Sequence, residues 1–245
     1  MTLPNPEIEK RDLAREYRRL LRAAEQSKGK EDRKRIRKAW ELAVEAHKDM
    51  RRRSGEAYIF HPISVARICA EEMGLDTTSI VCALLHDTVE DTWVTLDDIE
   101  RMFGKRERAI IDGLTKISGI FDPAQSAQAE NFRKMLLTLS DDIRVILIKI
   151  ADRLHNMRTL DSMKREKQLK IAGETDFMYA PLAHRLGLYA IKSELEDLSL
   201  RYRQPEEYAV IEQKLRKTKA VRTRFINSFA APIKEALTKE GLAFA

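Results

Sequence analysis

The sequence predicts an all-α protein. Only 9 of the 245 residues are glycine and 7 are proline, so the residues that most often break helices are scarce. Charged residues make up 34% of the chain, and apolar residues recur at helical spacing along almost all of it. The hydrophobic content of 43% is enough for a sizeable core, and the length allows one large domain or two small ones.

Composition also predicts the compartment in which the chain is found and the class of partner that it binds. It has no run of about 18 apolar residues and no apolar signal-peptide region at its start, which predicts a soluble, cytoplasmic protein without membrane contact. Cys69 and Cys82 lie in apolar helical context without metal-ligand spacing, so buried free thiols are expected. The net charge of +6, clustered near residues 30–53 and 214–224, favours polyanionic partners such as nucleotides, RNA or phosphate groups.

Two amphipathic helices are expected first, at residues 6–26 and 31–51, separated by a break over residues 27–29. His47 lies near the apolar face of the second helix. No ligand-spaced partner accompanies it, which favours a packed or surface histidine. The arginines at 51–53 then lead to Gly55, and two interpretations of them stay open. They form a solvated helix end that complements the helix dipole, or they contact a bound phosphate or base; the segment alone favours the first.

The next helices have clear start signals. Pro62 suits the first turn of a helix that Gly74 ends, which puts His61 at the helix start as a cap, a core residue or a ligand. Asp76 is a good N-cap for a helix over residues 77–90. Thr95 with Asp98 predicts a capping arrangement for a short helix that ends at residues 103–104. A helix over residues 106–117 follows.

The second half starts with a polar loop from Gly119 to about Gln128, long enough to cover a pocket. The remaining elements follow in order: an amphipathic helix at 129–139, a long buried helix at 143–160 capped by Asp141, a basic polar stretch at 164–170, a helical segment at 180–187 in which His184 is structural, an amphipathic helix at 188–203, and one long basic helix or a helix pair at 206–241.

The most informative stretch follows the apolar run at residues 80–85. His86 and Asp87 come directly after it, and Glu90 and Asp91 follow one turn later. On one continuous helix these residues are three or four apart, so an imidazole and three carboxylates gather beside residues that should be buried. Burying ionised groups without partners costs several kcal/mol, and a bound divalent metal would explain their presence.

A second polar group lies on the predicted helix 143–160. Asp152, Asn156 and Thr159 recur at i, i+4 and i+7, and the apolar run before them places Asp152 deep rather than on a salt-bridged surface. Lys149 interrupts that run, so it has an anionic partner or reaches solvent from the helix edge; the two readings are equally supported. Combined with His61 and the pair at 86–87, Asp152 completes a set of two imidazoles and two carboxylates. Such a set suits Mn²⁺, Fe²⁺ or Zn²⁺, and the lack of thiolates disfavours structural zinc.

Three motifs, at residues 52–62, 84–92 and 150–160, carry a more specific signal. In this order and spacing they resemble the HD hydrolase domain of the RelA/SpoT-type bifunctional alarmone synthetase/hydrolases of bacteria, over residues of about 30–210. The resemblance implies an HD-domain helical bundle with a basic C-terminal helical extension. The hydrolase domain is expected at 1–204, and 205–245 is expected as a helical lead-in to a synthetase domain that the chain lacks.

The resemblance also implies roles for individual residues. His61, His86, Asp87 and Asp152 match Mn²⁺ ligands, and Glu90 and Asp91 match the acidic pair that positions and activates the attacking water. Arg52, Arg53 and Ser54 match the loop that contacts the guanine end of the nucleotide, and Asn156 and Thr159 match residues on the nucleotide-facing side of the ligand helix. The implied reaction removes pyrophosphate from the 3′ position of (p)ppGpp, giving GDP or GTP. Lys149 is a candidate for stabilising the charge that builds up during transfer.

Two other functions stay open. The chain could be an HD phosphohydrolase of another nucleotide, against which residues 52–55 argue. It could instead be a non-catalytic module that binds alarmone or RNA through its basic face; the intact pair Glu90 and Asp91, which synthetase-only relatives tend to lose, weighs against this. A ribosome or RNA contact is expected only in a full-length context, and the sequence predicts no oligomeric state.

Overall fold

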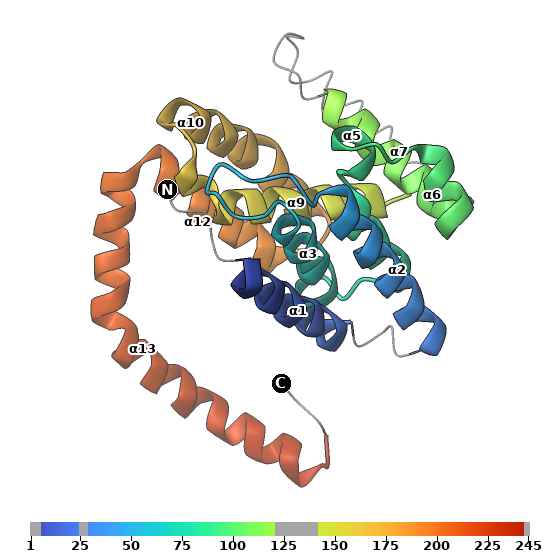
Figure 1. Ribbon diagram of the computed structural model, residues 1–245. Helices are drawn as coiled ribbons and strands as arrows, with labels where there is room; N and C mark the ends of the chain where they lie inside the picture. The colour runs from blue at the N-terminus through green and yellow to red at the C-terminus, as the bar shows by residue number, and fades with distance from the viewer. Residues whose placement is uncertain (1–5, 25–28, 121–141, 243–245) are drawn as a thin grey trace. The chain divides into compact units, whose positions relative to one another are not determined.

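The computed structural model describes residues 6–24, 29–120 and 142–242, and these are helical almost throughout (Figure 1). They contain no β-strand, and a single isolated antiparallel bridge joins Arg51 to Ala57. The all-α prediction is therefore confirmed. None of the helices in these ranges is both long and apolar enough to cross a bilayer.

The chain divides into two compact units, residues 1–199 and 200–245. The elements of the first unit, the last of which extends into the second, are α1 (Pro6–Ala23), α2 (Lys30–Ala46), α3 (Phe60–Arg67), the π-helical turn η1 (Ile68–Glu72), α4 (Thr77–Leu85), α5 (Thr88–Asp91), α6 (Leu96–Phe103), α7 (Lys105–Ile120), α9 (Arg144–Arg158), the 3₁₀ turn η2 (Leu160–Ser162), α10 (Arg165–Glu174), the π-helical turn η3 (Thr175–Tyr179), α11 (Ala180–Arg185) and α12 (Tyr189–Arg203). The second unit contains α13 (Pro205–Lys239), a single helix of 35 residues with no buried residue. The assignment of 1–204 and 205–245 to separate functions stays a prediction.

Helix α4 is the centre of the first unit. Helices α2, α3, α7 and α9 all pack against it, and every residue from Thr78 to Leu85 is buried. Each buried leucine or isoleucine there contributes about 1.5–3 kcal/mol of hydrophobic stabilisation. The two cysteines are buried free thiols, as expected. Because α4 is enclosed on all sides, the residues that follow its last turn are fixed in position between α3 and α9.

The single helix predicted over 77–90 is wrong. Helix α4 ends at Leu85, and α5 is a separate turn from Thr88 to Asp91. The ring Nδ1 of His86 lies 2.8 Å from the carbonyl oxygen of Ala83. The Thr88 hydroxyl donates a hydrogen bond to the carbonyl oxygen of Leu85 over 2.7 Å. These side chains satisfy carbonyls that a continuing helix would bond, so His86 and Asp87 occupy the turn between two helices.

Other boundaries differ by a few residues. Helix α2 ends at Ala46 rather than at residue 51, and α3 begins at Phe60, so His61 lies inside its first turn. The capping box of Thr95 and Asp98 is confirmed at the start of α6. The long basic segment is one helix rather than two. Residues 119–120 belong to the end of α7, while the rest of the predicted loop, the predicted helix 129–139 and the Asp141 cap lie outside the described residues.

Candidate metal centre

Two imidazoles and two carboxylates meet where α3, the end of α4 and α9 converge. The Nε2 atom of His61 lies 3.2 Å from Oδ1 of Asp152 and 3.6 Å from Oδ2 of Asp87. The Nε2 atom of His86 lies 3.1 Å from the same Asp87 oxygen and 3.9 Å from the same Asp152 oxygen. Ligand atoms of His61, His86 and Asp152 all lie within 4.8 Å of one another. The fold therefore brings together all four residues of the predicted ligand set.

Both imidazoles present Nε2 to this cluster because their other ring nitrogens are held. A backbone carbonyl can only accept a hydrogen bond, so its contact with Nδ1 of His86 places a proton on that nitrogen. Nδ1 of His61 lies 2.8 Å from Nδ1 of His155. The buried Nε2 atom of His86 lies 3.1 Å from Oδ2 of Asp87 without forming a geometrically sound hydrogen bond in the described structure, so a bound ion would complete its contacts. A divalent ion would use both Nε2 lone pairs, so these residues fit a metal centre.

The charges in the cluster depend strongly on one another. Burial favours the neutral form of both carboxyls, but the charge of His86 lowers the pKa of Asp87, and the contact with the His61 ring and the charge of Lys149 lower the pKa of Asp152. Burial likewise opposes charging of His86, yet the charges of Asp87 and Asp152 raise its pKa to about 9. Two carboxylates are thus held ionised at the base of the site.

Lys149 has an anionic partner, as the first of its two interpretations predicts. Its Nζ lies 3.9 Å from Oδ2 of Asp152, and its side chain is 11% exposed. Burial acts to lower its pKa, but the charges of Asp152, Asp87 and Glu90 outweigh burial and raise it. A fixed positive charge therefore lies beside the cluster.

Tyr58 connects the cluster to the acidic pair on α5. Its hydroxyl donates to Oδ2 of Asp87 over 2.6 Å and lies 3.2 Å from Oδ2 of Asp91. Its ring stacks on buried His47, with centroids 4.9 Å apart. His47 is thus a packed residue behind Tyr58, as favoured. Glu90 and Asp91 are both exposed, on the outer side of the cluster.

Arg52 reaches α9 from a tight loop. Its Nη2 donates to Oδ1 of Asn156 over 2.8 Å, and Nδ2 of Asn156 donates to Oδ1 of Asp152 over 2.7 Å. Gly55 closes the loop at φ 89°, a conformation that favours glycine. A chain of hydrogen bonds therefore runs from the Arg52 guanidinium to the candidate ligand Asp152.

Three predicted nucleotide-contacting residues are not joined to this cluster. Arg53 and Ser54 are exposed on the loop. Thr159 ends α9, where its hydroxyl donates to the carbonyl of His155 over 3.0 Å. The exposed His184 packs edge-on against Tyr189, with ring centroids 5.5 Å apart, and takes no part in the cluster.

Sequence reasoning missed the roles of Tyr58 and His155. Tyr58 precedes His61 by three residues, and His155 follows Asp152 by three, so helical spacing would have placed each near a candidate ligand. His155 is kept neutral, because burial and the neighbouring His61 and Arg52 lower its pKa to about 3. Its Nδ1 can therefore accept a hydrogen bond from the Nδ1–H of His61 and orient that ring.

Known proteins are similar to this chain over the region that contains the candidate metal centre. Residues 39–189 match the model of the HD domain family. The GTP pyrophosphokinase of Myxococcus xanthus is 47% identical over 211 residues, which is 84% of this chain and 28% of that protein. The bifunctional (p)ppGpp synthase/hydrolase SpoT of Escherichia coli K12 is 45% identical over 210 residues, 85% of this chain and 30% of that protein. The chain thus spans less than a third of the length of these relatives.

A solved structure agrees with this similarity. It is described as a metazoan ortholog of SpoT that hydrolyzes ppGpp, and it aligns with a TM-score of 0.50 and 25% identity over 69% of this chain and 96% of its own. The HD family match covers more than half of the chain and includes all four residues of the candidate metal centre. The resemblance predicted from the three motifs is therefore confirmed, and this chain belongs to the HD-domain family.

Proposed function

We propose that this chain hydrolyses the 3′-pyrophosphate of (p)ppGpp in a Mn²⁺-dependent reaction. The observation that carries the proposal is the set of two buried imidazoles and two partly buried carboxylates beside an exposed acidic pair and a partly buried lysine. Relatives from Escherichia coli O157:H7 and Aquifex aeolicus, 45% and 43% identical, carry the name guanosine-3′,5′-bis(diphosphate) 3′-pyrophosphohydrolase. A nucleotide with this chemistry also suits the net charge of +6.

Mn²⁺ is proposed on the donor set and the family resemblance together. Imidazole and carboxylate donors without thiolate suit Mn²⁺, Fe²⁺ and Zn²⁺, and the resemblance selects the first. His61, His86, Asp87 and Asp152 would hold the ion. When bound, it would supply positive charge that lowers the pKa of a water molecule and offsets charge on the transferred phosphorus.

The proposed reaction forms a bond between a water oxygen and the phosphorus attached to the ribose 3′ oxygen. The bond from that phosphorus to the 3′ oxygen breaks, and GDP or GTP and pyrophosphate result. We assign proton removal from the water to Glu90 or Asp91, since both are exposed and Tyr58 holds Asp91 beside Asp87. Lys149 supplies positive charge near the transferred group.

The nucleotide end of the substrate is assigned to the loop and the end of α9. Arg52 is already oriented by Asn156, so it would lose little freedom on binding. Arg53, Ser54 and Thr159 are exposed and available to a ligand. A panel of ppGpp, pppGpp, GTP, ATP and deoxynucleoside triphosphates, assayed for released pyrophosphate, tests the assignment. Selective cleavage of ppGpp and pppGpp is expected, and faster cleavage of another nucleotide would replace this proposal with a different HD phosphohydrolase activity.

Binding of Mn²⁺ is expected to release a proton from His86. In the metal-free chain its pKa is about 9, so the ring is an imidazolium at neutral pH and its Nε2 lone pair is not free. Below pH 9 the metal must displace that proton, so the apparent affinity should rise by up to about tenfold per pH unit and level off above pH 9. Calorimetry in PIPES and Tris, which differ in ionisation enthalpy, measures the released proton. An affinity that is constant between pH 6.5 and 8 would contradict the raised pKa of His86 in the metal-free site.

Tyr58→Phe is expected to lower kcat by about 10–100-fold, the usual cost of losing a group that hydrogen-bonds to a metal ligand. The substitution removes the hydroxyl that joins Asp87 to Asp91 and keeps the ring stacked on His47. Steady-state kinetics with a thermal melt measures the effect. Tyr189→Phe is the matched control, because Tyr189 also packs on a histidine ring but lies outside the site. Equal kcat for both variants would rule out this role for Tyr58.

A further inference from the structure

A hollow lies between α1 and α2, and it is lined by none of the residues of the metal centre. Its volume is about 470 Å³, which is within the range of about 300–1,000 Å³ that small-molecule sites occupy. Its lining residues are Ala14, Tyr17, Arg18, Leu21, Lys30, Arg33, Lys34, Arg37 and Trp40. None of them belongs to the cluster around Asp152.

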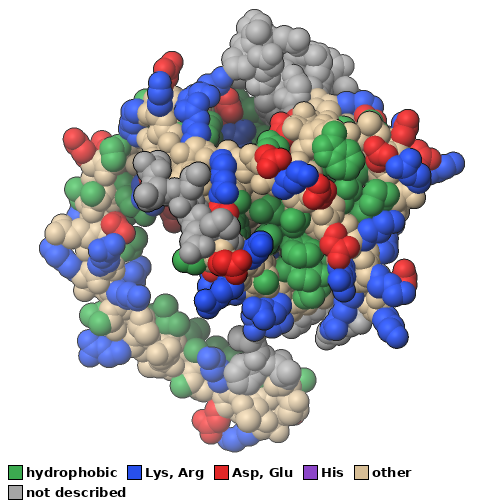
Figure 2. Space-filling view, in the orientation of Figure 1, with side chains coloured by type: hydrophobic (Ala, Val, Ile, Leu, Met, Phe, Trp, Pro, Cys, Tyr) green, Lys and Arg blue, Asp and Glu red, His purple; other side chains and the backbone are tan. Residues whose placement is uncertain are grey.

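The charged residues that line this hollow are all cationic. Lys34 and Arg37 have acidic partners on their own helix, Glu31 at 3.1 Å and Glu41 at 2.8 Å. Arg18, Lys30 and Arg33 form no ion pair with any residue in the described ranges. Figure 2 shows Lys and Arg side chains along α2 and hydrophobic side chains on the surface between α1 and α2. Three cations without an ion-pair partner in the described part of the chain, gathered around one hollow, favour a ligand with several negative charges.

The same hollow has an aromatic wall. The rings of Tyr17 and Trp40 stack with centroids 4.4 Å apart and an interplanar angle of 24°. The indole Nε1 of Trp40 is closed off from solvent, so the wall offers a ligand its aromatic surface rather than a hydrogen-bond donor. A ligand that carries a planar ring would pack against this pair.

We propose that the hollow between α1 and α2 is a second nucleotide site, which takes a nucleoside diphosphate or triphosphate. Phosphate oxygens pair with Arg18, Lys30 and Arg33, and the base packs against the Tyr17–Trp40 pair. The concave shape and the volume favour a small nucleotide over a nucleic acid strand. The proposal is independent of the reaction at the metal centre.

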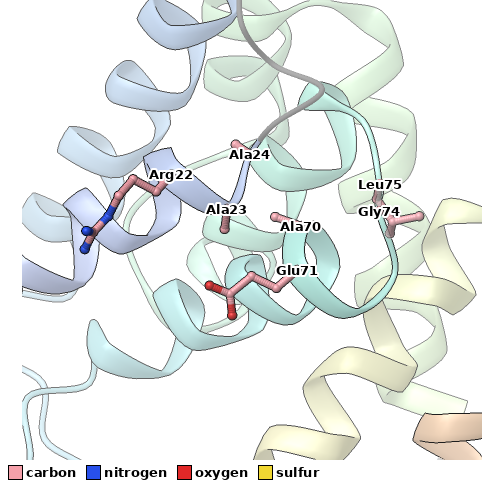
Figure 3. A pocket seen from close by; sticks show the side chains of 7 residues that line it. All are labelled: Arg22, Ala23, Ala24, Ala70, Glu71, Gly74 and Leu75. Atoms are coloured by element: carbon pink, nitrogen blue, oxygen red, sulfur yellow. The ribbon is translucent and has the colours of Figure 1, made fainter. Parts of the chain in front are cut away.

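A neighbouring hollow lacks the features that favour a nucleotide. It has a volume of about 390 Å³ and lies where the end of α1 meets η1 (Figure 3). Its wall consists mainly of alanine and glycine, with Arg22 as its one cation and Glu71 as its one acid. It contains no aromatic ring, so it offers neither the charge nor the stacking surface. Arg22 therefore provides a control for charge on α1.

Fluorescence of Trp40 tests the proposal directly. The chain has two tryptophans, so a Trp93→Phe background leaves Trp40 as the single reporter. Titration with GDP should give a saturable change. Adding Lys30→Glu with Arg33→Glu should weaken the GDP affinity by at least about tenfold, since each removes a charge-assisted contact. Arg22→Glu and Arg52→Ala should leave this affinity within about twofold, because neither residue lines the hollow. Circular dichroism confirms that each variant is folded.

Several results would overturn the proposal. The absence of a saturable change up to about 1 mM GDP or GTP would exclude a nucleotide site. Loss of the signal in Arg52→Ala but not in Lys30→Glu with Arg33→Glu would assign it to the other site. Equal binding of pyrophosphate and GDP would reduce the hollow to a phosphate site, and displacement of GDP by a short RNA of higher affinity would assign it to nucleic acid. None of these readouts depends on catalysis, so failure here and failure of the proposed hydrolysis are separate results.

Discussion

Asp152→Asn should abolish Mn²⁺-dependent turnover and weaken Mn²⁺ binding by more than about 100-fold, the upper range for losing a group that only supports a ligand. The substitution removes the charge that lies near both Nε2 atoms of the candidate ligands. It keeps the size of the side chain and an oxygen that can still accept from Asn156. The fold should therefore survive while the site is lost. Titration of Mn²⁺ by electron paramagnetic resonance and assay of pyrophosphate release measure the two effects.

The control for this substitution is Asp112→Asn. Asp112 pairs with Lys116 over 2.6 Å on α7, so it is also a helical aspartate beside a lysine, but it is not part of the candidate centre. Both variants should show cooperative thermal melts. Near-normal turnover by folded Asp152→Asn would eliminate Asp152 as a ligand and with it the metal centre as assigned.

Glu90→Gln and Asp91→Asn should each lower kcat by about 10²–10⁴-fold, the range for losing a general base. Mn²⁺ affinity should change little, because both residues are exposed on α5 and are not among the candidate ligands. This separation of binding from turnover distinguishes the acidic pair from the ligands. Calorimetric titration with Mn²⁺ and single-turnover cleavage of ppGpp measure the two quantities on the same preparations.

Asp97→Asn is the control for the acidic pair, since Asp97 is an exposed carboxylate near the start of the next helix. It should leave kcat unchanged. A large loss of Mn²⁺ affinity in Asp91→Asn would instead move Asp91 into the ligand set. Unchanged turnover in both Glu90→Gln and Asp91→Asn would remove the acidic pair from the reaction.

The candidate ligands could be predicted because their residue types conflict with their surroundings. His86 and Asp87 follow the apolar run at residues 80–85, and Asp152 follows another apolar run, so charge in buried surroundings could be predicted without a structure. Their meeting at one point is a tertiary result, set by the packing of α3 and α9 on α4. The sequence indicated which residues needed partners and suggested one shared set, and the family resemblance implied the same set.

The break after Leu85 could not be predicted from periodicity. The apolar and acidic residues fit one helix through residue 90, and only the side-chain bonds of His86 and Thr88 to backbone carbonyls end it earlier. Such local competition depends on rotamers that spacing does not reveal. Long-range hydrogen bonds could not be predicted from spacing either. Tyr58 and Asp91 are far apart in sequence, and nothing in either motif shows that they touch.

The three arginines at 51–53 show how tertiary contacts divide similar residues. Helix α2 ends at Ala46, so none of them complements its last turn. Arg51 pairs with Glu9 on α1, with Nη2 and Oε2 3.0 Å apart, while Arg52 turns to Asn156 on α9. Arg53 stays exposed. The favoured interpretation, a solvated helix end, is therefore wrong for Arg51 and Arg52, because the loop carries them back to two different helices.

The most direct test is turnover of ppGpp by the purified chain after EDTA treatment and after addition of Mn²⁺, with products separated by anion-exchange chromatography. We expect GDP and pyrophosphate in equal amounts, no turnover with EDTA, and recovery of activity with Mn²⁺. Absence of turnover with Mn²⁺ present, or release of inorganic phosphate instead of pyrophosphate, would contradict the proposed function.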